Sequence, residues 1–299
     1  MIKVENVTKY FDDFKALDGL NMNVPKGSIY GLVGPNGAGK STIIRHLTGV
    51  YKQDSGRITI DDQPVYENIP LKSKYAYIPD DFYYFTQANT IDMMKFYKNM
   101  YPNFSEELFY KIADCFTNID LKRNIRAHSK GMQKQIAFML SLSCRPELLI
   151  LDEPVDGLDP VMRRQIWSLI MSDVADHGVT VLISSHNLRE LEDVCDHVGI
   201  MNHGKLLIER SLDDLQGSIS KLQVAFSGEM PELPDNINII HKEQTGRVHT
   251  LIVREKPEDA TAKMSALNPI LLDVLPLTLE EIFIYELGGE NYAVKDIIL

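Results

Sequence analysis

Short apolar runs separated by turn residues occupy the first 62 residues of the chain and predict a β-rich section. Apolar side chains recur across residues 2–7 and again across residues 20–24, as expected of strands with one buried face. The second run ends at residues 25–27, a Pro-Lys-Gly sequence typical of a turn. Residues 57–62 add a further strand and turn. We therefore expect an antiparallel β section near the N-terminus.

Nearly continuous apolar runs form a second pattern, which alternates with helical periodicity. These runs cover residues 29–33, 75–79, 148–151, 180–183 and 198–201. Unbroken apolar runs are typical of parallel strands that are buried on both faces. Helical patterns lie between them, over residues 41–47, 129–142 and 162–175 and in a further helix between His186 and Val198. This alternation predicts an α/β core built on a parallel sheet.

Residues 82–145 differ from the rest because aromatic residues crowd their first part. These aromatic residues are Phe82, Tyr83, Tyr84, Phe85, Phe96, Tyr97, Tyr101 and Phe104. Helical patterns begin near Thr90 and near Ser105, and Ser105 suits a helix N-cap because two glutamates follow it. We predict a helical subdomain over about residues 82–145. Most of its aromatic side chains then form its core, and any exposed subset is a candidate docking patch for a partner.

The pattern changes again after about Gly217, where short strands and helices follow one another. Strands are predicted at residues 222–226, 237–239, 248–253 and 270–275, and helices at 260–267 and 279–287, with a turn region at 231–235. We therefore divide the chain into a domain of residues 1–217 and a small α+β domain of residues 218–299. The small domain carries no catalytic constellation, which favours a structural, dimerising or regulatory role.

Composition narrows the possible functions of the 299 residues. The net charge of −11 disfavours nonspecific binding to nucleic acid, so we expect no nucleic-acid partner. The three cysteines lie far apart without metal-type spacing, which favours a reducing compartment. Residues 1–5 begin no signal peptide, and no uncharged apolar run approaches the roughly 18 residues of a membrane span. We expect a chain that does not cross a bilayer by itself but can lie beneath one on a partner.

A phosphate-binding loop is predicted where the apolar run 29–33 meets the helical pattern 41–47. The intervening segment fits G-x-x-x-x-G-K-[ST] and consists of Gly34, Pro35, Asn36, Gly37, Ala38, Gly39, Lys40, Ser41 and Thr42. Glycines let backbone N–H groups close around an anion, and the helix N-terminus adds positive potential. Lys40 would then reach the β- and γ-phosphates, and the Ser41 hydroxyl would bind Mg²⁺.

Two carboxylates complete this chemistry at the end of the apolar run 148–151. Asp152 stands where the second half of a phosphate-loop site usually holds Mg²⁺, and Glu153 directly after it can polarise an attacking water. His186 follows the next strand, from which it could reach a γ-phosphate, although a histidine at a strand end is by itself more often structural. Upstream of the loop, Tyr10 and Phe11 suit two interpretations equally, a purine-stacking aromatic or a core aromatic at a strand end.

These motifs together resemble the ATP-binding-cassette (ABC) ATPases. Residues 34–42, 129–133, 148–153 and 157–159 and His186 occur in the order and spacing of that family, and the resemblance covers roughly residues 1–215. It implies a P-loop NTPase of the ABC type, with a RecA-like α/β core, an antiparallel β section and a helical subdomain. It also implies an ATPase that uses ATP and Mg²⁺ as the separate subunit of a bacterial transporter, similar to exporters of peptides and antibiotics.

The family also implies an assembly and a place in the cell. Two ATP-binding subunits, identical or different, form a head-to-tail dimer with two ATP molecules between them. Integral membrane subunits are the further partners, which places the chain at the cytoplasmic face of the membrane. The aromatic-rich stretch of residues 82–104 lies beside Asp80, where the family binds its membrane partner.

Residue roles carry over by alignment with the family's motifs. Phe11 aligns with the adenine-stacking aromatic, with Tyr10 as the alternative, and the loop residues bind phosphate. The Mg²⁺ set implied by the resemblance is Ser41, Asp80 and Asp152. The general base is Glu153, and His186 contacts the γ-phosphate. Ser129 and Gly131 are expected to bind the partner's ATP, and Asp159 is expected to lie in the loop that crosses the dimer.

Three positions depart from the family pattern. Lys130 stands where the family usually has glycine, and Asp156 stands where a small or amide residue is common. Asp80 stands where glutamine is usual after residues 75–79. A carboxylate there can still bind Mg²⁺, but it repels phosphate and donates no hydrogen bond unless protonated. These departures bear on the rate and coupling of hydrolysis rather than on the fold.

The alternative function is that of a soluble ABC ATPase acting on ribosomes or DNA. Ribosome-acting members carry two cassettes in one chain, whereas this chain has one. DNA-repair members insert long coiled coils, for which residues 82–128 are too short. The acidic balance also argues against nucleic acid. The ATPase of an importer is a third alternative that the sequence does not exclude. We expect the ATPase subunit of an exporter.

Overall fold

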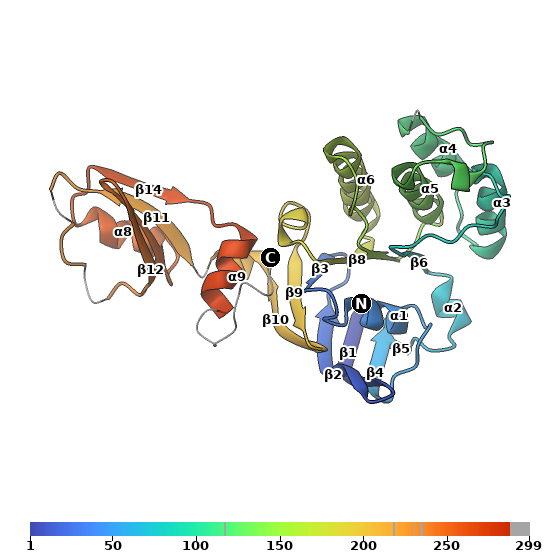
Figure 1. The fold of residues 1–299 in the computed structure, drawn as a ribbon, viewed down its shortest axis with the longest axis horizontal. Helices are drawn as coiled ribbons and strands as arrows, with labels where there is room; N and C mark the ends of the chain where they lie inside the picture. Colours follow the sequence, from blue (N-terminus) through green and yellow to red (C-terminus); the bar gives the residue numbers. More distant parts are fainter. Residues whose placement is uncertain (117, 218, 229, 234–235, 288–299) are drawn as a thin grey trace. The chain divides into compact units, whose positions relative to one another are not determined.

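Two compact units make up the chain, Met1–Glu209 and Arg210–Leu299 (Figure 1). The structure is a computed structural model that describes residues 1–116, 118–217, 219–228, 230–233 and 236–287. The division between the units falls within strand β10 (Lys205–Ser211), eight residues before the boundary expected from the sequence (217 − 209 = 8).

The first unit contains two sheets. An antiparallel sheet has the strand order β2–β1–β4–β5, and its strands are β1 (Ile2–Phe11), β2 (Phe14–Val24), β4 (Ser55–Ile60) and β5 (Gln63–Pro64). A larger sheet has the order β10–β9–β3–β8–β7–β6, and its further strands are β3 (Ile29–Val33), β6 (Tyr75–Ile78), β7 (Leu148–Asp152), β8 (Thr180–Ser185) and β9 (His197–Asn202). Strands β9, β3, β8, β7 and β6 are parallel. The predicted fold class, an α/β core with an antiparallel section, is confirmed.

Five helices of this unit occupy positions that the sequence predicted, with small shifts at their ends. They are α1 (Lys40–Leu47), α3 (Thr90–Met100), α4 (Glu106–Cys115), α5 (Lys130–Ser143) and α6 (Pro160–His177). Helix α2 (Ile69–Lys72) was not predicted, and a 3-10 turn lies at Ile125–Ala127. Helix α4 begins as expected, because the Ser105 side chain accepts a hydrogen bond from the Leu108 N–H. Helices α3, α4 and α5 lie together as one helical group (Figure 1).

The helix predicted between His186 and Val198 is wrong. Only the 3-10 turn Leu188–Glu190 forms there. The backbone N–H of Asp196 donates to the Ile29 carbonyl at 2.8 Å, and the Asp196 carboxylate accepts from the Ile29 N–H at 2.8 Å. Asp196 is thus fixed against the sheet, and residues 191–194 form turns rather than a continuous helix.

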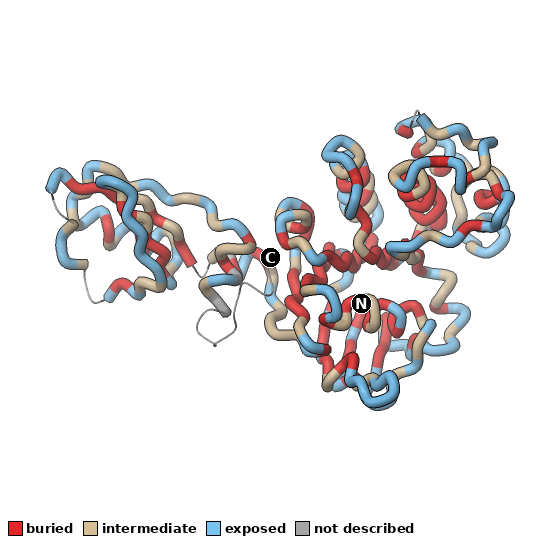
Figure 2. The backbone as a smooth tube through the Cα atoms, viewed as in Figure 1, coloured by how far each residue is buried: buried red, intermediate tan, exposed pale blue. Residues whose placement is uncertain are grey.

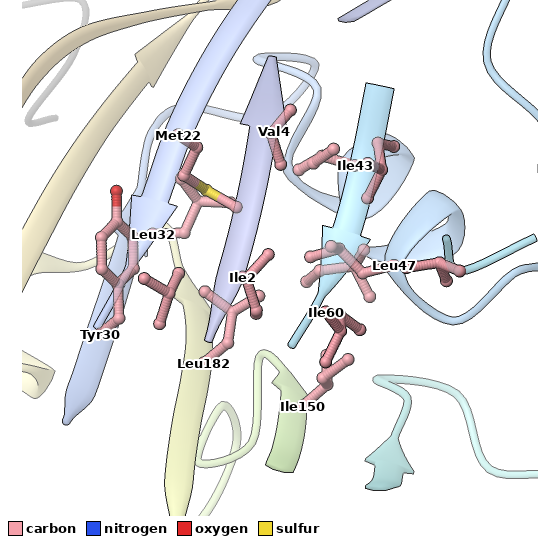
Figure 3. Close-up of a cluster of buried hydrophobic side chains, with 14 of the residues drawn as sticks. Ile2, Val4, Met22, Tyr30, Leu32, Ile43, Leu47, Ile60, Ile150 and Leu182 are labelled. Carbon is pink, nitrogen blue, oxygen red and sulfur yellow. The ribbon is translucent and has the colours of Figure 1, made fainter. Parts of the chain in front are cut away.

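A hydrophobic core between the two sheets holds helix α1. Figure 3 shows Ile43 and Leu47 of α1 facing Ile2 and Ile60 of the antiparallel sheet and Ile150 of the parallel sheet. All five side chains are almost completely buried. Burial of this kind contributes roughly 1.5–3 kcal/mol for each large apolar side chain. The core therefore fixes the first turn of α1 against the carboxyl ends of the parallel strands.

The second unit is a small α+β fold. Its antiparallel sheet has the order β12–β13–β11–β14, and its elements are α7 (Leu212–Gln216), β11 (Ser220–Ala225), β12 (Ile239–Thr245), β13 (Val248–Val253), α8 (Pro257–Ser265), β14 (Leu271–Leu275) and α9 (Leu279–Leu287). Leu222, Leu251 and Met264 belong to its core, which Figure 2 shows in red along the strands. The predicted turn at 231–235 lies partly outside the described residues.

Across the described residues, none of the helices has both the length and the apolar composition that a membrane span requires.

Candidate functional site

The glycine-rich segment of residues 34–42 connects strand β3 to helix α1, which is the context that a phosphate-binding loop requires. Gly34 has no room for a side chain, because a Cβ atom there would lie 2.2 Å from the Met201 carbonyl oxygen. Gly39 stands directly before α1 with a φ of 107°, which glycine adopts without strain. The first N–H groups of α1 therefore remain available to an anion.

A cavity of about 300 Å³ lies at the N-terminus of α1. Its lining consists of Phe14, Ala16, Pro35, Asn36, Gly37, Ala38, Gly39, Lys40, Ser41, Thr42, Asp80 and Glu153. Most of the loop residues predicted from the sequence therefore share this cavity with both an aromatic side chain and two carboxylates. A helix N-terminus, a lysine and a ring suit a ligand that carries phosphates at one end and a base at the other.

Lys40 is held in the loop by the chain itself. Its Nζ donates to the Gly34 carbonyl oxygen at 2.6 Å and lies 3.6 Å from Glu153 Oε1. Burial lowers the pKa of Lys40, and the negative charges of Glu153 and Asp152 act in the opposite direction. Lys40 therefore lies at the cavity, paired with the Glu153 carboxylate. A phosphate bound in the cavity can compete with that carboxylate for the lysine.

Asp152 ends strand β7 and is buried. One of its carboxylate oxygens, Oδ1, accepts a hydrogen bond from the Ser184 hydroxyl at 2.5 Å. The Ser41 hydroxyl donates to the same oxygen at 3.4 Å. The serine after the loop lysine and the aspartate after the apolar strand thus meet, as the sequence predicted for a pair that shares one cation.

Glu153 begins the β7 turn, residues 153–156, with a φ of 48°. This left-handed conformation is uncommon for a residue with a side chain. The Glu153 N–H donates to the Ser184 hydroxyl at 3.1 Å and to the Ser184 carbonyl at 3.2 Å. Glu153 Oε2 lies 2.9 Å from His186 Nδ1 and accepts from the His186 N–H at 3.3 Å. The structure therefore brings Glu153 and His186 together at the cavity that holds Lys40.

Asp80 lines the same cavity, two residues after strand β6. Burial raises the pKa of Asp80, the positive charge of Lys134 acts to lower it, and the nearby carboxylates Asp81, Asp152 and Asp156 act to raise it. The sequence alignment that put Asp80 beside the phosphate loop thus agrees with its position.

The aromatic side chain that lines the cavity is Phe14 rather than Phe11 or Tyr10. Phe11 stands opposite Phe14 at the end of the β1–β2 hairpin. The Phe11 ring contacts Tyr51 edge-on, with 5.3 Å between the ring centres. Phe14 is 65% exposed, which for an aromatic residue suggests a free stacking face. Alignment with the family's motifs pointed to Phe11 and missed Phe14, which the two-residue turn of the hairpin places opposite it.

Ser129, Gly131 and Asp159 do not line this cavity. Ser129 caps α5 by accepting from the Met132 N–H at 3.3 Å, and Asp159 caps α6 by accepting from the Met162 N–H at 3.0 Å. A Cβ atom at Gly131 would lie 3.2 Å from the Met162 sulfur, so the starts of the two helices touch. These predicted residues therefore form a second cluster in the same unit.

Two further residues belong to the site and were not assigned from the sequence. Lys134 on α5 is only 6% exposed, and its Nζ donates to the Glu153 carbonyl at 2.9 Å and to the Asp156 carbonyl at 2.8 Å. The sequence signal that could have identified Lys134 was its position directly before residues 135–144, which contain no charged residue. Ser184 pairs with Asp152 in the register of β7 and β8, and its signal was its place at the end of a buried strand.

The donors at the cavity fit a magnesium ion that arrives with phosphates. Among the described residues, no group of three or more His, Cys, Asp and Glu side chains could hold a metal ion by itself. Mg²⁺ bound with a nucleotide needs only one or two protein oxygens, because phosphates and waters supply the rest. The Ser41 hydroxyl and the Asp152 carboxylate, 3.4 Å apart, are oxygen ligands of the kind that Mg²⁺ prefers.

Comparison with known proteins agrees with this geometry. Residues 17–156 match the family model described as "ABC transporter". The chain is 30% identical over 294 residues to the ABC transporter ATP-binding protein YtrB of Bacillus subtilis, covering 97% of this chain and 99% of that protein. It is 32% identical over 314 residues to the bacitracin transport ATP-binding protein BcrA of Bacillus licheniformis, covering 97% and 98%.

Solved structures show the same fold. A structure described as the ATP-binding subunit of an ABC transporter superposes with a TM-score of 0.66 at 25% identity, covering 72% of this chain and 92% of that chain. The predicted resemblance is therefore confirmed.

Removal of the Ser184 hydroxyl tests how the carboxylates are held. We expect Ser184→Ala to lower the free energy of unfolding of the first unit by about 1–3 kcal/mol, because the buried Asp152 carboxylate and the Glu153 N–H each lose a partner. Urea unfolding followed by the fluorescence of Trp167, which is the chain's one tryptophan and is buried in α6, measures this unit.

Ser172→Ala is the matched control. The Ser172 hydroxyl also donates to an aspartate, Asp176 at 3.1 Å, but on the exposed face of α6. Its loss should change the free energy of unfolding by no more than about 0.5 kcal/mol. Equal losses in the two variants would contradict the role assigned to Ser184.

Proposed function

This chain belongs to the ABC transporter family of ATP-binding proteins, and we propose that it is the ATP-hydrolysing subunit of an exporter whose membrane-spanning part is formed by other chains. The observation that carries the proposal is the meeting of Lys40, Ser41 and Asp152 with Glu153 at one cavity. The family model and full-length relatives support ATP hydrolysis, and the relative BcrA is named for bacitracin transport. We extend antibiotic or peptide export to this chain on that likeness.

The phosphates of ATP bind over the N-terminus of α1. Lys40 turns from the Gly34 carbonyl and Glu153 toward the β- and γ-phosphates, because a polyphosphate offers more negative charge than one carboxylate. Residues 34–42 supply backbone N–H groups. The adenine base stacks at the end of the β1–β2 hairpin, where Phe14 lines the cavity and Phe11 stands opposite it.

Hydrolysis needs a base and a donor beside the γ-phosphate. Glu153 accepts the proton of the attacking water, since its carboxylate lies at the cavity and is freed when Lys40 leaves it. His186 is 2.9 Å from that carboxylate, so it can hold the base in position and contact the γ-phosphate. Ser41 and Asp152 would hold Mg²⁺, with Asp80 as a further oxygen in the cavity. When bound, Mg²⁺ neutralises charge that develops on the phosphate oxygens.

The second cluster supports a head-to-tail dimer. Ser129, Gly131 and Asp159 lie outside the cavity of their own subunit, although the N-terminus of α5 and the Ser129 hydroxyl suit a phosphate. We propose that they complete the ATP site of a second ATP-binding subunit, identical to this one or different. ATP binding then closes the dimer, and hydrolysis reopens it.

Membrane subunits bind an exposed apolar patch on α3 and on the segment that precedes it. The patch consists of Tyr83, Phe85, Phe96 and Met100, which are between 42% and 81% exposed. Phe85 and Phe96 contact each other edge-on, with 5.2 Å between their ring centres, and grouped exposed apolar side chains are typical of a protein interface. Through it the chain would lie at the cytoplasmic face of the membrane. Residues 218–299 remain an accessory domain in this proposal, and nucleic acid has no part in it.

Replacement of the proposed base tests the ATPase mechanism. Glu153→Gln should bind ATP with an unchanged Kd, because Lys40 and residues 34–42 are intact. Its kcat should fall by about 10²-fold or more, as for the loss of a general base. Single-turnover hydrolysis and nucleotide titration of the purified chain measure the two quantities, and size-exclusion chromatography should show the variant as a dimer with ATP.

Glu107→Gln, the same change at an exposed position in the first turn of α4, should keep the wild-type kcat. A Glu153→Gln variant that turns over ATP at the wild-type rate would remove Glu153 from the mechanism.

A photo-reactive residue in place of Tyr83 tests the membrane partner. Tyr83 is 81% exposed, so the probe should cross-link in native membranes to an integral membrane protein that resists carbonate extraction. The control position is Tyr110, which is 42% exposed on α4 outside the patch. Adducts at neither position, or equally at both, would count against this docking surface.

A further inference from the structure

Lys134 is a buried cation that none of the roles above uses. It lies on α5, five residues after the helix cap Ser129, and is 6% exposed. Its ammonium group donates to two carbonyl oxygens of the β7 turn, that of Glu153 at 2.9 Å and that of Asp156 at 2.8 Å. Hydrogen bonds from a charged donor are about twice as strong as neutral ones. One side chain therefore spans the two ends of the turn that begins with the proposed base.

The Glu153 peptide groups need this kind of support because their conformation is unfavourable. A residue other than glycine in a sparsely populated backbone region persists only when its surroundings hold it there. Ser184 holds the Glu153 N–H. On the other side, the Glu153 carbonyl accepts from Lys134 at 2.9 Å and more distantly from the Asp156 N–H at 3.4 Å. The direction of the Glu153 carboxylate follows from these anchors.

We propose that Lys134 is a positioning residue for ATP hydrolysis, which holds the β7 turn so that the Glu153 carboxylate faces the γ-phosphate and which fastens that turn to helix α5. In this role Lys134 acts through the backbone of Glu153 and not on the nucleotide itself. This inference rests on the base role proposed for Glu153.

The charges that face Lys134 explain why a lysine can be buried here. Burial lowers the pKa of Lys134, whereas Asp80, Asp156, Glu153 and Glu190 act to raise it. These groups come from three different segments of the first unit: the residues after β6, the β7 turn and the 3-10 turn after β8. The Lys134 ammonium thus offsets part of the repulsion among carboxylates gathered at one end of the sheet.

The helix that carries Lys134 also begins with the second cluster. Ser129 and Gly131 precede Lys134 by about one turn on a rigid helix of 14 residues. If contact with a partner's nucleotide displaces the start of α5, Lys134 moves with the helix, and the β7 turn that it holds moves as well. Lys134 is the direct connection between the residues proposed to serve the partner's ATP and the base that serves the subunit's own.

Lys134→Met tests the proposal, because methionine keeps an unbranched chain and removes the donor. We expect kcat for ATP to fall by about 10-fold or more, since small misplacements of a catalytic group have effects of this size. The Kd for ATP should stay within about twofold, because the phosphate loop is untouched. Lys134→Gln, which keeps an N–H donor for one carbonyl, should give a kcat between those of Lys134→Met and the wild type. It also serves as the test variant if Lys134→Met does not fold.

Lys111→Met on the exposed face of α4 is the matched control and should keep both constants. Wild-type kcat in Lys134→Met would overturn the proposal, as would equal losses in kcat and ATP affinity, which indicate general damage. In that case the proposed function still stands when Glu153→Gln is inactive in the same assay. If Glu153→Gln retains full turnover instead, the base role itself fails and this inference falls with it.

Discussion

The parallel register of three adjacent strands is the constraint on which the site depends. Strand β8 lies between β3 and β7, and Ser184 of β8 pairs with Leu32 on one side and with Asp152 on the other. Since parallel strands end at the same edge of a sheet, the phosphate loop after β3 and the carboxylates after β7 must emerge together. The core around α1 then fixes the helix that we propose receives the phosphates. No single loop builds the site, and a shift of one strand would separate its parts.

Two buried lysines contact different groups of Glu153 at the carboxyl edge of the parallel sheet. Lys40 faces the Glu153 carboxylate, and Lys134 holds the Glu153 carbonyl. Lys40 is thus paired with the carboxylate that we propose acts later on water. In the proposed mechanism a polyphosphate competes for Lys40 but not for Lys134, which contacts the Glu153 carbonyl rather than its carboxylate. Substrate binding can therefore release the carboxylate of Glu153 while its backbone stays in place.

Local patterns allowed the fold and much of the site to be predicted from the sequence. The loop of residues 34–42 and the pair Asp152 and Glu153 depend on short contiguous motifs, each joined to a strand whose apolar run is unmistakable. Lys134 and Ser184 were missed because their roles depend on contacts between segments distant in sequence. A lysine on a helix usually faces solvent, and nothing local distinguishes one that crosses to a neighbouring turn.

Elements that depend on tertiary contacts were also where prediction failed. The apolar spacing after His186 matched a helix, but the pairing of Asp196 with Ile29 drew the chain back to the sheet. The place of Phe14 at the cavity was not predicted, because it depends on the hairpin turn that sets Phe14 opposite Phe11.

In the proposed dimer, each ATP site combines the phosphate loop of one subunit with the start of α5 of the other. Complementation between two inactive variants tests this most directly. Lys40→Ala disables the first part and Ser129→Arg the second. A mixed dimer has one site with both defects and one site that is intact. With random pairing, the mixture should regain about a quarter of the wild-type sites, as expected for a two-fold dimer with shared sites. ATP hydrolysis by the mixture at that level is the predicted result; a mixture as inactive as its components, beside an active wild type, would contradict the shared site.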